Sequence, residues 1–203
     1  MIMTKYISPE AFRLAEEVKF DLRVPPLLLK YHLYDPALLK HCENVALITA
    51  QMCIQQKMPH AKALEIVTAA WLHDIGKIHI PKSILNKTTK LYDYEYLLIK
   101  IHPVIGAVMS MQLNFSKAVT DIILHHHERM TGNGYPDHLK PEQISPGVRM
   151  VMEADAYEAL TAVRPYGSVY SGENALYIME NSHDYSMDYI RNVFSRKKGV
   201  NSV

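Results

Sequence analysis

The chain has 203 residues, a length that suits one domain with a substantial core and is short for two typical domains. Hydrophobic residues make up 48% and charged residues 21%, which excludes the disordered and collagen-like classes. Lysine and arginine total 22 against 21 acidic residues, so no global positive charge indicates a nucleic-acid polymer as partner.

The apolar segments do not indicate a membrane protein. The longest uncharged stretches, such as residues 101–116, are shorter than a membrane span and contain proline or polar residues. Residues 1–10 lack the apolar region of a secretory signal, so we expect no membrane insertion and a cytoplasmic location. Cys42 and Cys53 are expected on one helix, about 16 Å apart along its axis, which rules out a disulfide between them.

Apolar residues at helical spacing, with caps and prolines at their starts, predict helices along most of the chain. Ser8-Pro9 begins the first helix, which Pro25-Pro26 should prevent from extending, and Asp35-Pro36 begins a long helix that carries His41. Residues 61–72 should form a helix that is buried nearly all round and ends at His73-Asp74. Further helices are expected at 82–85, 92–101, 104–113, 116–127 and 145–160, and two closing helices near 171–173 and 183–184.

No run of residues alternates between apolar and polar over the length of a strand. The predicted class is therefore all-α, a single helical bundle of seven or more helices.

Eleven histidines are the unusual count in this composition. A single histidine is more often solvated than a metal ligand, but His73-Asp74 end an apolar helix, where an ionisable pair is costly to desolvate unless it is paired or binds a metal. Imidazole and carboxylate groups suit divalent zinc, manganese and iron, and two paired ions need about seven ligands. Seven candidates lie on five predicted helices or helix ends: His41, His73, Asp74, His102, His126, His127 and Asp155.

Four segments resemble, in order and spacing, the signature blocks of the HD-GYP phosphodiesterases. They are His73-Asp74-Ile75-Gly76-Lys77, His126-His127-Glu128-Arg129, Gly134-Tyr135-Pro136, and 155–161 together with Arg164-Pro165-Tyr166. A lone His-Asp pair would be a weak signal, but the combined pattern is specific. The resemblance implies a bundle of the HD-domain type with a catalytic domain at 31–194, an N-terminal helical extension at 1–30 and a tail at 195–203.

The resemblance also implies the reaction and the ligand set. The expected activity is hydrolysis of cyclic di-GMP to linear pGpG by a hydroxide held between two divalent ions, iron or manganese; the sequence leaves open whether pGpG or GMP is the end product. The resemblance assigns Asp74 as the bridge between the ions. It assigns the other ligands as follows: His41, His73 and Asp155 to one ion, and His102, His126 and His127 to the second.

Three further residues match substrate contacts of the family. Lys77 corresponds to a lysine that reaches the substrate phosphate, where a fixed cation would stabilise the charge of the transition state. Tyr135 corresponds to a tyrosine that contacts the dinucleotide, and Arg164 to an arginine near the phosphates. The alternative for each is a side chain that is only solvated or packs its loop.

The sequence departs from the family at several positions. Ala37 stands one helical turn before His41, where some relatives carry a glutamate that helps to bind a third metal, so we expect two ions. Gly167 and Thr131 replace groups that serve substrate affinity. Arg129 is expected to be a structural ion-pair residue, and the remaining histidines are expected in the second coordination shell or at the surface: His32, His60, His79, His125, His138 and His183.

Two other functions remain open from the sequence. One is another HD-type phosphohydrolase, acting on a nucleotide or a guanosine polyphosphate, which would share the metal chemistry. The other is a catalytically weak module that binds a cyclic dinucleotide or a protein, for which a diguanylate cyclase is a candidate regulatory partner.

Overall fold

The structure is a computed structural model that describes residues 4–162 and 169–194. Every regular element in these residues is a helix, so the predicted all-α bundle of seven or more helices is confirmed. The α-helices are α1 (Pro9–Glu17), α2 (Val24–Tyr34), α3 (Pro36–Gln55), α4 (His60–Leu72), α5 (Lys82–Leu85), α6 (Asp93–Lys100), α7 (His102–Gln112), α8 (Lys117–His125), α9 (Pro146–Thr161), α10 (Gly172–Ser182) and α11 (Ile190–Phe194). Short 3-10 turns are η1 (Thr4–Tyr6), η2 (Val18–Phe20), η3 (Ile75–His79) and η4 (Pro141–Gln143).

The helix starts follow the caps in the sequence. The side chains of Ser8, Asp35 and Ser145 each accept a hydrogen bond from a backbone N–H of the first turn, and a proline follows each cap. Such a cap satisfies one of the donors that a helix start leaves unpaired. Because these starts are encoded locally, the beginnings of α1, α3 and α9 agree with the sequence-based expectation.

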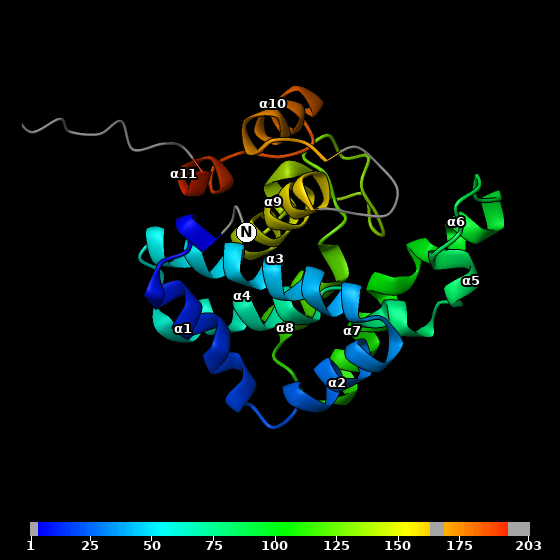
Figure 1. Ribbon diagram of the computed structural model, residues 1–203, viewed down its shortest axis with the longest axis horizontal. Helices are drawn as coiled ribbons and strands as arrows, with labels where there is room; N and C mark the ends of the chain where they lie inside the picture. The colour runs from blue at the N-terminus through cyan, green and yellow to red at the C-terminus, as the bar shows by residue number, and fades with distance from the viewer. Residues whose placement is uncertain (1–3, 163–168, 195–203) are drawn as a thin grey trace, which may run out of the picture.

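The α4 helix lies at the centre of the bundle. It packs against α3 on one side and α8 on another, while α3 also contacts α1 and α9 (Figure 1). Residues 66–72 are all buried, as their nearly uninterrupted apolar character predicts. The chain segment that leaves α4 therefore starts in the interior, and His73 and Asp74 are buried with it.

Three helices differ from the expectation. α2 is absent from the sequence-based expectations, because Pro25-Pro26 is there interpreted as a stop; the prolines instead lie in the first turn, where a missing N–H costs no intrahelical bond. The last helix begins at Ile190 rather than near His183, which is the left-handed C-cap of α10 with φ of 58°. α8 ends at His125, so His126 and His127 lie in the turn that follows it.

No helix in the described part of the chain combines the length and the apolar character that crossing a bilayer requires.

Gly76 sets how closely η3 approaches the start of α7. A β-carbon at this position would lie 2.0 Å from the carbonyl oxygen of His102 and 2.9 Å from the backbone nitrogen of Gly106. Both neighbours are backbone atoms, so a side chain could be accommodated only by moving α7. The glycine in the His-Asp block thus allows His102 to approach Asp74.

We predict that Gly76→Ala destabilises the fold by about 1 to 3 kcal/mol or more, the usual cost of forcing extra volume into a packed interior. The variant should also bind divalent metal more weakly, since α7 carries His102. Chemical denaturation and metal titration measure the two effects. An unchanged unfolding midpoint would contradict this account of the close approach.

Candidate metal centre

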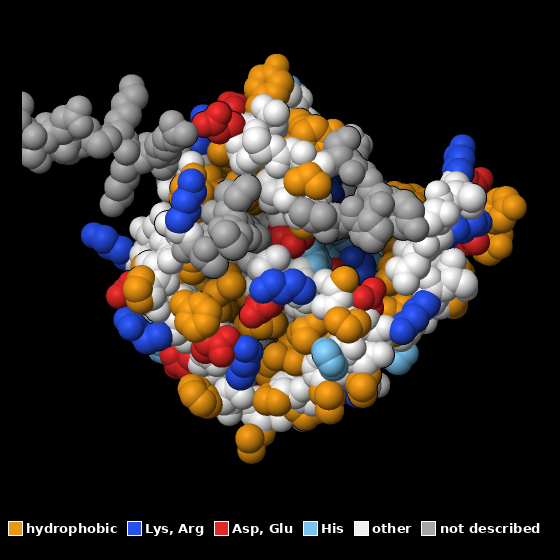
Figure 2. Space-filling model, viewed as in Figure 1, with side chains coloured by type: hydrophobic (Ala, Val, Ile, Leu, Met, Phe, Trp, Pro, Cys, Tyr) orange, Lys and Arg blue, Asp and Glu red, His pale blue; other side chains and the backbone are white. Residues whose placement is uncertain are grey.

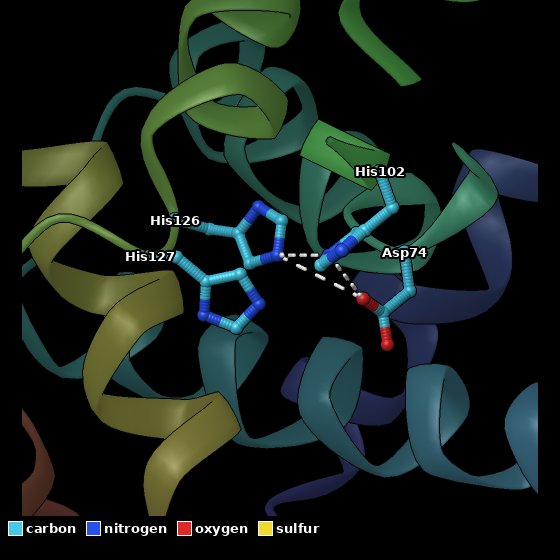
Figure 3. Close-up of side chains that lie close together, drawn as sticks. All are labelled: Asp74, His102, His126 and His127. Atoms are coloured by element: carbon cyan, nitrogen blue, oxygen red, sulfur yellow. Dashed lines mark hydrogen bonds and ion pairs between the residues drawn. The ribbon is translucent and has the colours of Figure 1, made fainter. Parts of the chain in front are cut away.

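Two groups of ligand-type side chains lie in contact at the centre of the bundle. In each group the candidate ligand atoms all lie within 4.8 Å of one another. One group consists of Asp74, His102, His126 and His127 (Figure 3), and the other of His41, His73 and Asp155. The structure thus brings together all seven residues singled out as ligands in the sequence; their role as ligands stays a prediction.

Five segments far apart in the chain supply these side chains. α3 carries His41, and α9 carries Asp155. His73 and Asp74 follow the end of α4, while His102 is the first residue of α7. His126 and His127 follow the end of α8. This is how an all-α bundle directs polar side chains from facing helices into its core.

The carboxylate of Asp74 connects the two groups. Its Oδ1 lies 3.1 Å from Nε2 of His102 and 3.7 Å from Nε2 of His126. Its Oδ2 lies 3.5 Å from Nε2 of His41 and 3.4 Å from Nε2 of His73. Ligand atoms that share an ion at about 2.0 to 2.2 Å lie about 3.0 to 3.6 Å from each other. Each oxygen of Asp74 is therefore placed to serve a different group.

Backbone carbonyls orient three of the histidines. Nδ1 of His73, His102 and His126 lies 2.8, 2.7 and 2.7 Å from the carbonyl oxygens of Ala70, Ile99 and Ile123, respectively. A carbonyl oxygen only accepts, so Nδ1 must carry the proton in each neutral ring, and Nε2 is left unprotonated. All three Nε2 atoms face the centre as free lone pairs, the form in which imidazole binds a metal.

Several buried atoms that face the centre have no hydrogen-bond partner among the described residues, and a cation could take that place. Nε2 of His73 and Oδ1 of Asp74 are buried without a hydrogen-bond partner in the described structure. Nε2 of His102 and Nε2 of His126 lie 3.3 Å apart (Figure 3), and with Nδ1 protonated in each neutral ring there is no proton between them to share. Lone pairs and a buried carboxylate oxygen in such contact repel unless a positive charge lies among them. The donor set therefore fits divalent metal ions.

The ionisation states of His126 and Asp74 agree with metal binding. Burial, together with the neighbouring His73 and His102, lowers the pKa of His126 to about 4, so this imidazole is neutral at pH 7. Burial alone would raise the pKa of the Asp74 carboxyl, but Lys77 and His73 lower it well below its usual range. Neutral imidazoles and an ionised carboxylate are the forms that coordinate a cation.

Comparison with known proteins gives the family. The model of the HD domain family matches residues 30–189. The chain belongs to the HD domain family. The match confirms the family resemblance that was inferred from the signature blocks.

Two curated relatives and one solved structure illustrate the range of similarity. The HD domain is 36% identical over 161 residues to the cyclic di-GMP phosphodiesterase PA4108 of Pseudomonas aeruginosa, a match that covers 79% of this chain and 39% of that protein. It is 32% identical over 148 residues to the 3'3'-cGAMP-specific phosphodiesterase 3 of Vibrio cholerae, covering 73% and 32%, respectively. The chain thus spans about two fifths or less of the length of these relatives.

Bd1817, a HDG"Y"P protein from Bdellovibrio bacteriovorus, has a similar structure. The TM-score is 0.66 at 20% sequence identity, and the match covers 90% of this chain and 60% of that one. At this identity the likeness supports the HD-domain fold and nothing finer.

Glu158 supports His41 from outside the two groups, and it was not among the sequence candidates. Its Oε2 lies 2.5 Å from Nδ1 of His41, and its Oε1 accepts a hydrogen bond of 3.0 Å from the side-chain amide of Asn44. A carboxylate at Nδ1 fixes the ring so that Nε2 faces the centre. Burial opposes a charged ring, but the hydrogen bonds that the ring donates to Asp155 and Glu158 raise the pKa of His41 to about 9. The signal in the sequence was its spacing of three residues from Asp155, which places both on one helix face.

Lys77 and Tyr135, which the resemblance assigns to the substrate, each contact a candidate ligand; their role as substrate contacts stays a prediction. Nζ of Lys77 donates to Oδ2 of Asp74 at 2.6 Å. The Tyr135 ring stacks on the His127 ring, with centroids 4.9 Å apart and planes 29° apart. Arg164 lies outside the described residues.

The loop that carries Tyr135 is tied to the ligand turn by a buried acid. Glu128 is fully buried, and its two oxygens accept hydrogen bonds from the backbone N–H groups of Asp137 and Leu139. A β-carbon at Gly134 would lie 2.3 Å from the α-carbon of Glu128, so only glycine permits this approach. The Gly-Tyr-Pro block therefore places the tyrosine ring against His127.

His125 is turned toward two acids rather than toward the ligands. Its Nδ1 lies 3.0 Å from Asp121 and its Nε2 lies 2.9 Å from Asp137. It belongs to neither ligand group. Its contacts with Asp121 and Asp137 tie α8 to the loop that follows Pro136.

We predict that Glu158→Gln weakens divalent-metal binding by about tenfold or more, because the neutral amide stabilises the ring of His41 less well. Calorimetric titration of Mn²⁺ into metal-stripped protein measures the affinity. Glu153→Gln is the matched control: it is buried on the same helix, but its carboxylate bonds to Ser186 and to the N–H of Ile190. Equal weakening in both variants would contradict the specific role of Glu158.

Proposed function

We propose that this HD domain is a metal-dependent phosphodiesterase that hydrolyses cyclic di-GMP to linear pGpG, with GMP as the product of a second cut. One observation carries the proposal: the two oxygens of the buried Asp74 face two separate groups of ligand atoms. The named activities of the two curated relatives, which act on cyclic dinucleotides, support the substrate class.

The proposed centre holds two divalent ions, iron or manganese, with Asp74 as the ligand common to both. The remaining ligands divide as the two groups do: His41, His73 and Asp155 for one ion, and His102, His126 and His127 for the other. Such a pair of ions supplies a strong nucleophile from water at neutral pH and polarises the phosphodiester oxygens. The protein's part is to present seven donors in a fixed arrangement at the centre of the bundle.

Lys77 and Tyr135 act on the substrate itself in this proposal. The ammonium group of Lys77 lies beside Asp74, within reach of a phosphate bound at the centre, and a fixed cation there stabilises the growing charge on phosphorus oxygens. Tyr135 forms a wall of the site next to His127 and can contact the bound dinucleotide through its ring or its hydroxyl. Arg164 would add a planar cation for the phosphates.

A panel of substrates tests the proposal against its alternatives. Turnover is compared on cyclic di-GMP, 3'3'-cGAMP, a deoxynucleotide and guanosine tetraphosphate, with metal-loaded and metal-stripped protein. The proposal predicts metal-dependent cleavage of cyclic di-GMP above the last two compounds. Saturable binding without turnover would instead indicate a binding module, including one controlled by a partner such as a diguanylate cyclase. A preference for a nucleotide would indicate another HD-type hydrolase.

Asp74→Ala should abolish turnover and release metal, because the loss of a shared ligand leaves two cations to repel each other at about 3.5 to 4 Å. His125→Ala should be far milder, since His125 faces Asp121 and Asp137. Elemental analysis and a turnover assay compare the two variants. Equal loss of metal in both would show that the ligand pair after α8 is wrongly assigned.

The proposed number of ions rests on Ala37, which lies one turn before His41 on α3. Metal analysis should give about two ions per chain. Ala37→Glu would place a carboxylate on the same helix face, about 5 to 6 Å between β-carbons from His41, and should raise the metal content. Three fully occupied ions in the wild-type protein would refute the argument from Ala37.

A further inference from the structure

Two more side chains continue outward from the metal centre beyond Tyr135. Nζ of Lys100 lies 4.6 Å from the centroid of the Tyr135 ring and 5.7 Å from that of the Tyr96 ring. Since the Tyr135 ring is stacked on His127, these contacts form an unbroken series from a candidate ligand to the surface of α6. We call Tyr96 and Lys100 the outer pair.

The position of the outer pair is coupled to the ligand His102. Tyr96 and Lys100 are four residues apart on α6, so they share one face of the helix. α6 ends at Lys100 and α7 begins at His102, whose Nδ1 donates to the carbonyl oxygen of Ile99. The backbone that fixes the orientation of His102 therefore also fixes where the outer pair stands relative to the centre.

The charge of Lys100 is not neutralised by an acid of the described residues. Its ammonium group is held by the faces of two tyrosine rings, as in a cation–π contact. Lys87 provides a contrast in the same region, because it donates to the carboxylate of Glu95 at 2.6 Å. A lysine without a carboxylate partner can still form a charge-assisted hydrogen bond with an incoming anion.

Tyr96 offers an open aromatic surface beside this cation. Tyr96 is 53% exposed to solvent. α5 and α6 project at one edge of the bundle (Figure 1), where hydrophobic, basic and acidic side chains are exposed together (Figure 2). An exposed aromatic ring next to a lysine is the combination that binds the bases and phosphates of nucleotides through stacking and charge.

A cyclic dinucleotide presents two phosphates and two purines, and a metal centre of this kind acts on one phosphate at a time. We propose that the outer pair binds the half of the substrate that does not react: Lys100 pairs with the second phosphate, and Tyr96 stacks on a purine. This inference rests on the proposed function and deepens it. It assigns α6, which lies outside the signature blocks, to the recognition of the dinucleotide.

The test compares two substrates in metal-loaded protein. Cyclic di-GMP engages the outer pair, whereas bis(p-nitrophenyl) phosphate has a single phosphate and no purine. Lys100→Met should raise the KM for cyclic di-GMP about tenfold or more, the effect of losing one charge-assisted contact, while kcat changes little. Tyr96→Leu should also raise the KM for cyclic di-GMP. Tyr96→Phe should keep this KM close to the wild-type value, because the aromatic ring remains. The rate on bis(p-nitrophenyl) phosphate should fall less than about threefold in each variant.

Tyr94→Leu is the matched control, since Tyr94 lies on the same helix, is 60% exposed and stacks on Tyr92 instead. An unchanged KM for cyclic di-GMP in Lys100→Met would overturn the inference, as would an equal loss of activity on both substrates. If the wild-type protein binds cyclic di-GMP without cleaving it, the proposed hydrolysis is wrong, whereas the outer pair still predicts a weaker Kd in Lys100→Met by calorimetry. Absence of both binding and turnover would overturn both proposals.

Discussion

The buried carboxylate of Asp74 is the constraint on which the rest of the structure depends. It is ionised and 1% exposed, and apart from Nζ of Lys77 the nitrogen atoms around it are histidine Nε2 atoms rather than a full set of hydrogen-bond donors. Burial of such a charge is costly unless positive charge accompanies it. Lys77 supplies one cation at Oδ2, and divalent ions on either side would supply the remainder.

The helices are arranged so that this charge can be held in the interior. α4 is buried nearly all round, and its end delivers His73 and Asp74 to the centre. The carbonyl groups of Ala70, Ile99 and Ile123 accept from the outer nitrogens of three histidines, so the ends of three segments orient ligands with their own backbone. The side-chain carboxylate of Glu158 on α9 orients His41 in the same way. The fold and the site are thus built from the same contacts.

Local signals made most of this predictable. The capped starts of α1, α3 and α9 and the apolar run of α4 follow from residues close in sequence. The signature blocks contain five of the seven candidates that converge, and the wider resemblance added His41 and His102. The helix α2 was harder to predict, because Pro25-Pro26 can either end one helix or occupy the first turn of the next. Tertiary packing decides between these two possibilities. Glu158 and the outer pair depend on which helices cross, which is set by tertiary contacts that one sequence does not display.

The most direct test of the account is a crystal structure of the metal-loaded protein with anomalous scattering. The account predicts two anomalous peaks per chain, one bonded to His41, His73 and Asp155 and the other to His102, His126 and His127. Each peak should also lie within bonding distance of a different oxygen of Asp74. A single peak, or two peaks that do not share Asp74, would contradict the central claim.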